Sequence, residues 1–101
     1  QVTRHKIAEM ATKTAAARSF VSITAAKLRD GQDVTTDAAM VKNFAVDACS
    51  FTTDAAVQIH GGMGYMRESI VERLYRDARL YPIGGGTTEI MREMIGRNLI
   101  G

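Results

Sequence analysis

Three consecutive glycines, Gly84, Gly85 and Gly86, are the residues of this sequence best suited to contact a ligand through the backbone. Glycine has no side chain to obstruct a ligand, and it readily adopts the positive φ angles that close approach can require. A helix-like segment, Thr87–Leu99, follows at once, and the free N–H groups at a helix start bind anionic or electron-rich groups. Because ordering three glycines costs considerable entropy, close approach of a ligand is the interpretation that we favour for this loop.

Two further groups of residues have both a ligand-binding and a purely structural interpretation. Gln58, Gly61 and Gly62 could present backbone groups to a pyrophosphate or an isoalloxazine ring, although their spacing alone favours a helix C-cap and turn. Thr87 and Glu89 are, in the structural interpretation, the cap and a first-turn acid of the helix that follows the glycines. The local pattern leaves both interpretations open.

Several other kinds of chemistry find no support in the sequence. Cys49 is the only cysteine, so no internal disulfide and no thiolate zinc site can form. His5 and His60 lie far apart without the neighbours of a metal site, and we find no nucleophile triad and no Walker loop. The net charge of +2 comes with dispersed basic residues, which does not indicate nucleic acid binding. No segment approaches the roughly 18 apolar residues that span a bilayer.

The spacing of the apolar residues predicts four helices and no strand. The expected helices are Gln1–Asp30, a second that starts after a cap at Thr35 or Thr36 and ends at Gly61, Gly62 and Gly64, Glu68–Leu80, and Thr87–Leu99. Gly31 is expected to end the first helix as a left-handed cap. The many alanines of the first two helices indicate closely spaced backbones, as in an antiparallel pair joined by a short turn.

The same spacing predicts which side chains face the core. The expected buried residues are Ile7, Met10, Ala17, Val21 and Leu28, then Val41, Phe44, Ala48, Phe51, Ala55 and Ile59, then Ile70, Leu74 and Ala78, and finally Ile90 or Met91, Met94 and Ile95. A chain of 101 residues forms one domain at most. Because it begins without an initiator Met and already in helical register, we interpret residues 1–101 as a fragment of a larger protein.

Three segments together resemble the C-terminal helical domain of acyl-CoA dehydrogenases. They are Gln58-Ile59-His60-Gly61-Gly62-Met63-Gly64-Tyr65, Arg73-Leu74-Tyr75-Arg76-Asp77-Ala78-Arg79 and Ile83-Gly84-Gly85-Gly86-Thr87-Thr88-Glu89-Ile90. The resemblance covers nearly the whole chain and implies an all-α fold, an antiparallel four-helix bundle that packs against a separate β-barrel and an N-terminal helical domain. It also implies a homotetrameric flavoprotein of fatty acid metabolism that binds FAD between subunits. Such enzymes oxidise an acyl-CoA substrate and pass the electrons to electron-transfer flavoprotein.

Carried over by position, the ligand contacts of the family fall on named residues of this chain. Those expected near the FAD of a neighbouring subunit are Gln58, Ile59, His60, Gly61 and Gly62, and Gln1 is also expected near a flavin. Those expected near the FAD of the same subunit are Thr87, Thr88 and Glu89. Gly84, Gly85 and Gly86 are expected to line the acyl-CoA site. Most relatives place a large aromatic residue at Gly84, so we expect room here for branched or bulky acyl groups.

The resemblance also shows that a catalytic group is missing from the glycine loop. Most members of the family carry, in its middle, the glutamate that removes the α-proton of the thioester, and here that position is Gly85. The long-chain and isovaleryl types also lack this glutamate and carry the base on an earlier helix, which implies a base before Gln1. Glu89 belongs to the matched Thr-x-Glu element, so we exclude it as the base. We expect no catalytic residue within this chain, and we expect the isolated fragment to be inactive and to bind FAD weakly or not at all.

Two alternative functions remain open at this stage. An acyl-CoA oxidase-like or nitroalkane oxidase-like flavoenzyme would share the bundle but send electrons or substrate elsewhere. A non-catalytic helical assembly domain would keep the glycines only for packing. The resemblance implies the cytoplasm for a bacterial protein and the mitochondrial matrix for a eukaryotic one, and the sequence does not distinguish these compartments.

Overall fold

The computed structural model describes all 101 residues and contains helices but no strand. The helices are α1 (Val2–Arg29), α2 (Thr35–His60), α3 (Gly62–Tyr65), α4 (Ile70–Ala78) and α5 (Thr88–Ile100). The predicted all-α class is therefore confirmed, and each of the four predicted helices is present. The single turn α3 was not predicted. No helix is long and apolar enough to cross a membrane.

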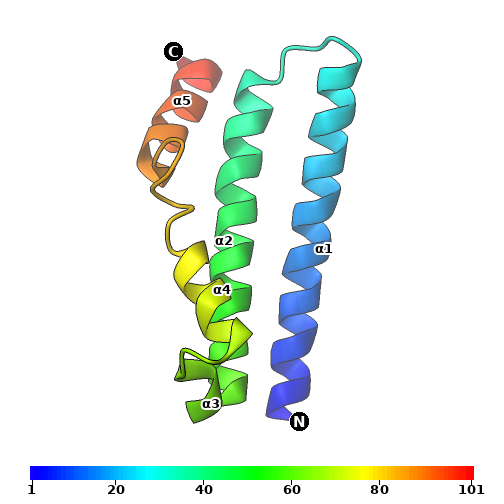
Figure 1. The fold of residues 1–101 in the computed structure, drawn as a ribbon. Helices are drawn as coiled ribbons and strands as arrows, with labels where there is room; N and C mark the ends of the chain where they lie inside the picture. Colours follow the sequence, from blue (N-terminus) through cyan, green and yellow to red (C-terminus); the bar gives the residue numbers. More distant parts are fainter.

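Helix α2 lies at the centre of the domain (Figure 1). Helix α1 packs antiparallel along one side of it, and α4 and α5 follow one another along the other side, running back against α2 (Figure 1). Helix α1 contacts neither α4 nor α5. The molecule is consequently elongated, with extents of 47 × 25 × 24 Å.

The turn between α1 and α2 confirms one predicted cap and corrects another. Gly31 has a φ of +81°, and the N–H of Gln32 donates to the carbonyl of Lys27 at 3.0 Å, which is the bonding of a Schellman cap. The prediction that a threonine caps α2 was wrong, because the N-cap is Val34 and has no side-chain bond. The hydroxyl of Thr35 instead donates to the carboxylate of Asp33 at 2.7 Å.

This contact gives Asp33 an electrostatic role at the start of α2. Hydrogen bonds from the hydroxyl and then from the backbone N–H of Thr35 hold the pKa of Asp33 below its usual value. A carboxyl whose pKa is lowered by folding stabilises the folded state above its unfolded pKa. The contribution is therefore present at neutral pH and is lost as the pH falls through the lowered pKa of Asp33.

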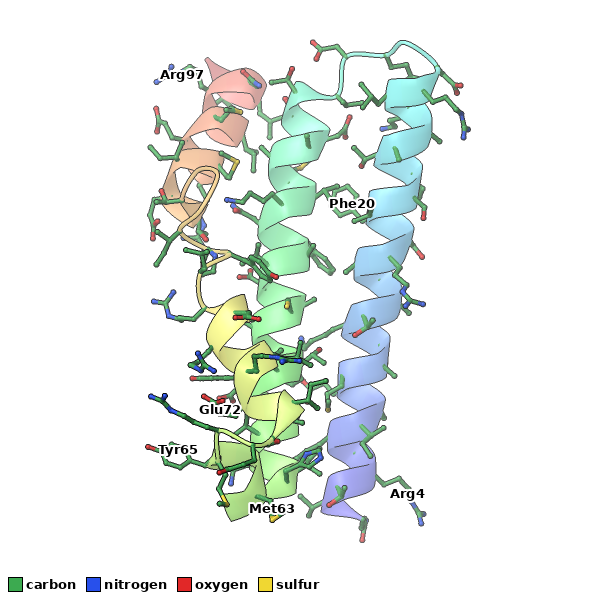
Figure 2. All side chains as sticks on the ribbon, in the orientation of Figure 1. Arg4, Phe20, Met63, Tyr65, Glu72 and Arg97 are labelled. Carbon is green, nitrogen blue, oxygen red and sulfur yellow. The ribbon has the colours of Figure 1, made fainter.

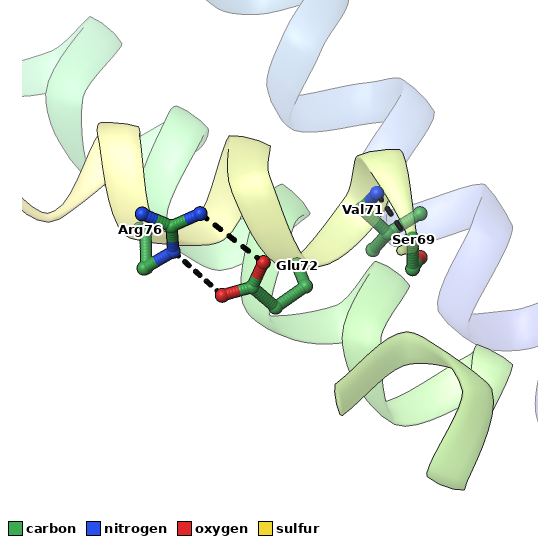
Figure 3. Close-up of polar contacts among 4 residues, drawn as sticks. All are labelled: Ser69, Val71, Glu72 and Arg76. Atoms are coloured by element: carbon green, nitrogen blue, oxygen red, sulfur yellow. Dashed lines mark hydrogen bonds and ion pairs between the residues drawn. The ribbon is translucent and has the colours of Figure 1, made fainter. Parts of the chain in front are cut away.

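Helix α4 is shorter than predicted, because Ser69 caps it by accepting a hydrogen bond from the N–H of Val71 at 3.3 Å (Figure 3). One turn later, Arg76 donates to the carboxylate of Glu72 at 2.6 Å (Figure 3). Residues four apart on a helix face one another, which explains this pairing. The hydrogen bond from Arg76 is the main reason why the pKa of Glu72 lies below its usual value.

The interior of the domain is small and lies along α2. Ala39, Val46 and Ala48 of α2 are buried, as are Ala78 of α4 and Met91 of α5. Small side chains on α2 allow its neighbours to approach closely, which supports the antiparallel pairing predicted from the alanines. The buried positions that were predicted correctly are Ala48, Ala78 and Met91.

Many of the other predicted core residues are exposed in this chain. Those that expose more than a third of their surface are Ile7, Val21, Leu28, Phe44, Ile70, Leu74, Ile90 and Met94. Phe20 points toward α2 and meets Phe44 edge to face at 6.1 Å, yet Phe44 remains 43% exposed (Figure 2). The accessible surface is 7235 Å², whereas a compact monomer of this mass exposes about 5,600 Å². The prediction that these side chains face a core is therefore wrong for this chain, because no other helix covers them.

Gly64→Ala should destabilise the domain. An added Cβ would lie 2.7 Å from the carbonyl oxygen of Val57 and 2.8 Å from the Cβ of His60, and neither atom can rotate away. We expect a loss of about 1–3 kcal/mol, the usual cost of overpacking, measured as a lower thermal midpoint of the full-length protein. Gly96→Ala in α5 is the control, because nothing lies within 4 Å of its added Cβ. Equal midpoints for the two variants would contradict close packing of α3 on α2.

Candidate functional site

The glycine loop, Gly84–Gly86, connects α4 to α5 beside the N-terminal third of α2 (Figure 1). Gly85 has a φ of +69° and Gly86 a φ of +112°, so both use backbone conformations that side chains disfavour. Thr87 then caps α5, because its hydroxyl oxygen accepts a hydrogen bond from the N–H of Ile90 at 3.2 Å. The predicted structural role of Thr87 is confirmed.

Two residues of α2 hold the loop, and the sequence analysis did not identify either. The Lys42 ammonium donates to the carbonyl of Gly84 at 2.7 Å and also to the carbonyl of Gly86. The amide of Asn43 donates to the carbonyl of Thr88 at 3.2 Å. The signal for them was the polar pair Lys42-Asn43 within an otherwise apolar stretch of the second helix, residues 38–46.

These contacts use carbonyl groups and leave N–H groups of the same segment free. The N–H groups of Gly85, Gly86, Thr87 and Glu89 have no acceptor within the chain, whereas that of Thr88 donates to Pro82 at 3.1 Å. Unpaired N–H groups at a helix start form a site for an anionic or carbonyl oxygen. The loop and the first turn of α5 can therefore donate several hydrogen bonds to a ligand.

A second exposed backbone surface lies at the C-terminal end of α2. Gly61 has a φ of +63° and its N–H donates to the carbonyl of Gln58 at 3.2 Å, so the predicted helix C-cap is present. Gln58, His60, Gly61 and Gly62 are exposed, and Ile59 is half-buried. An added Cβ at Gly61 or Gly62 would meet nothing within 4 Å, so a flat group can approach this backbone. The surface fits a cofactor ring or pyrophosphate as well as it fits a simple turn.

The structure separates the predicted cofactor contacts into two sets. Gln1 lies at the same end of the α1–α2 pair as Gln58–Gly62 (Figure 1). Thr87–Glu89 lie beside Asn43, which at about 1.5 Å per residue places them about 25 Å along α2 from His60. The two sets of predicted contacts therefore lie on separate surfaces of the domain.

The sequence and the fold both identify the family. The family model for the acyl-CoA dehydrogenase C-terminal domain matches residues 1–100. The chain belongs to the acyl-CoA dehydrogenase family. Members of this family are FAD flavoproteins, and the resemblance stated from the motifs is confirmed.

Individual relatives show how much of a family member this chain represents. The chain is 48% identical to acryloyl-CoA reductase (NADH) of Anaerotignum propionicum, over 93% of this chain and 24% of the relative. It is 40% identical to the mitochondrial long-chain specific acyl-CoA dehydrogenase of Sus scrofa, over 99% of this chain and 23% of the relative. Butyryl-CoA dehydrogenase of Megasphaera elsdenii superposes with a TM-score of 0.94 at 39% identity, covering 97% of this chain and 26% of that structure. The chain thus spans about a quarter of the length of these relatives.

Gly86→Ala should disturb the conformation of the glycine loop. The added Cβ would lie 2.6 Å from the Cε of Met91 and would occupy a strained φ of +112°. We expect a stability cost of about 1–2 kcal/mol together with a changed flavin spectrum in the full-length protein. Gly31→Ala is the matched control, since it carries similar strain in the distant α1–α2 turn. A flavin spectrum that responds equally to both variants would show that the effect is not local to the loop.

Proposed function

We propose that this chain is the FAD- and acyl-CoA-contacting domain of a larger flavoenzyme that catalyses α,β-dehydrogenation of an acyl-CoA thioester. The observation that carries the proposal is the glycine loop, whose free N–H groups stand at the start of α5 in a fold shared with this family. The N–H groups of Gly85 and Gly86 precede α5 and are unpaired in addition to the free donors that any helix start has, and packing alone does not require them. This difference favours the enzyme over the assembly domain.

The reaction removes a proton from the α-carbon and a hydride from the β-carbon, and leaves a 2-enoyl thioester. FAD supplies the acceptor for the hydride when it is bound. The N–H of Gly85, which has no partner in the chain, donates to the thioester carbonyl oxygen. This hydrogen bond stabilises the negative charge that develops on the oxygen as the α-proton leaves. Gly84 and Gly86 let the acyl group lie against the backbone.

The cofactor contacts require more than one subunit. Thr87, Thr88 and Glu89 contact the FAD of their own subunit, while Gln1 and Gln58–Gly62 contact that of a neighbour. The separation of about 25 Å along α2 supports this division, and the exposed apolar faces support burial against other parts of the assembly. We propose a homotetramer with electron-transfer flavoprotein as its electron acceptor.

The base lies outside this chain in our proposal. No carboxylate stands in the glycine loop, and Glu89 is an exposed residue in the first turn of α5. An acid on an earlier helix, as in the long-chain and isovaleryl types, would supply the missing group. The family base thus comes from a different segment, while the loop retains its hydrogen-bonding role.

The full-length protein tests this function directly. It should purify with a bound flavin whose absorbance is bleached by a saturated acyl-CoA in the absence of oxygen. Rapid reoxidation of the reduced flavin by oxygen would favour an acyl-CoA oxidase. Reduction of a 2-enoyl-CoA without the reverse reaction would favour a reductase. A full-length protein without flavin would contradict the enzyme and favour an assembly domain.

Gly85→Glu should restore part of the turnover lost when the upstream base is removed. Replacing that base by its amide should lower kcat by about 10²- to 10⁴-fold, the usual contribution of a positioned general base. Position 85 tolerates a side chain sterically, since an added Cβ meets nothing within 4 Å, although its φ of +69° adds strain. Gly85→Gln in the same background is the control and should restore nothing. If no upstream acid is needed for turnover, the relocated base is disproved.

Gly84→Tyr should make the enzyme selective against branched substrates. An added Cβ lies 3.6 Å from the Cγ of Leu80, an ordinary contact, so the position accepts a side chain. In our proposal, the tyrosine ring takes up part of the acyl site. Each excluded methylene shifts discrimination by about 1–3 kcal/mol. We therefore expect kcat/KM to fall further for a branched thioester than for a linear one of equal length, with Gly84→Ala as control. Equal losses on both substrates would assign Gly84 to loop conformation alone.

A further inference from the structure

We propose that Lys42 is a positioning residue, which orients the peptide planes of the glycine loop so that their N–H groups face the ligand. The inference rests on the proposed function, because it concerns how the chain presents hydrogen-bond donors to an acyl thioester. Lys42 itself contacts backbone carbonyls rather than the ligand. Its role is therefore exerted through the loop.

The ammonium group of Lys42 contacts the peptide units Gly84–Gly85 and Gly86–Thr87, which lie on either side of the Gly85–Gly86 peptide. It donates to the carbonyl of Gly84 at 2.7 Å and to that of Gly86, and these residues lie 42 and 44 positions further along the chain. No other side chain donates a hydrogen bond to the loop carbonyls. One charged group of α2 thus holds the first and the last of the three peptide units between Gly84 and Thr87.

Because a peptide unit is planar, the hydrogen bonds that fix its carbonyl direction also fix the direction of its N–H group. All peptide bonds of the chain are trans, and the C=O and N–H of a planar trans peptide point in opposite directions. With the Gly84 carbonyl directed at Lys42, the N–H of Gly85 points away from it. The same argument directs the N–H of Thr87 away, because it shares a peptide unit with the Gly86 carbonyl. These are two of the N–H groups that have no acceptor in the chain.

The loop has few other restraints on these planes. Its three residues have no side chains, and glycine populates positive and negative φ with similar ease. Without the ammonium group, the two peptide units could rotate and direct their carbonyls toward the ligand instead. Such a rotation would replace a donor by an acceptor where the thioester oxygen lies.

A carbonyl vibration measured in the full-length flavoprotein tests the inference. The probe is trans-2-butenoyl-CoA labelled with ¹³C at its carbonyl, because hydrogen bonding lowers the carbonyl stretching frequency. The variants are Lys42→Met, which keeps the apolar stem and loses the donors, and Lys42→Arg, which keeps a charged donor. Lys6→Met is the control, since Lys6 on α1 is similarly half-exposed and makes no hydrogen bond or ion pair.

The wild-type enzyme and Lys6→Met should both lower the carbonyl frequency of the bound probe. Lys42→Met should lose most of this shift and lose kcat by about 10- to 100-fold, with a smaller change in KM. Lys42→Arg should recover part of both. A Lys42→Met enzyme that binds the probe with the full wild-type shift would overturn the inference.

Two further outcomes distinguish a failure of this inference from a loss of folding and from a failure of the proposed function. If Lys42→Met does not retain flavin, Lys42→Gln carries the test, because its shorter neutral amide should give only part of the shift. A full shift in Lys42→Gln would again overturn the role of Lys42. A wild-type protein that binds no flavin would instead overturn the proposed function, and this inference with it.

Discussion

Packing against α2 is the constraint on which the rest of the structure depends. Helices α1, α4 and α5 each contact α2, and α1 contacts neither of the other two. The position of any outer helix is therefore defined by the surface of α2 that it meets. The same helix ends at the exposed turn of Gly61 and Gly62. It also carries Lys42, which donates to the carbonyls of the glycine loop. Displacing α2 would separate both ligand surfaces from the scaffold that holds them.

The exposed apolar faces follow from this open arrangement. A single central helix can cover only one side of each neighbour, so residues such as Leu28 and Ile100 remain exposed. The accessible surface exceeds that of a compact monomer of equal mass by more than a quarter. Burial of this surface by the remainder of a family member would contribute a large part of the stability. The exposed apolar faces are thus available to pack against other segments.

In the proposed function, the glycine loop binds the substrate while the base lies on another segment. Backbone donors at Gly85 and Thr87 depend on the peptide planes, which α2 orients through Lys42. A carboxylate at position 85 would be a separate feature, added to a backbone whose φ of +69° disfavours a side chain. Hydrogen bonding and proton removal can therefore be assigned to different segments without changing the loop.

Sequence reasoning succeeded where the physical cause is local. Helical periodicity, the left-handed Gly31 and the capping Thr87 each depend on residues within a few positions, and all three were predicted. The start of α2 was predicted wrongly, because Asp33 competes for the hydroxyl of Thr35.

Tertiary structure decided the features that join distant segments. Periodicity identifies an apolar face but not what covers it, so Phe44 was predicted as buried and is exposed. The bonds from Lys42 to the loop cross 42 and 44 residues, a separation at which no local pattern specifies a contact. The separation of the predicted cofactor contacts into two sets likewise depends on the length of α2. By itself the sequence determined the helices, the caps at Gly31 and Thr87, and the family, whereas the fold decided which backbone groups are held and which remain free for a ligand.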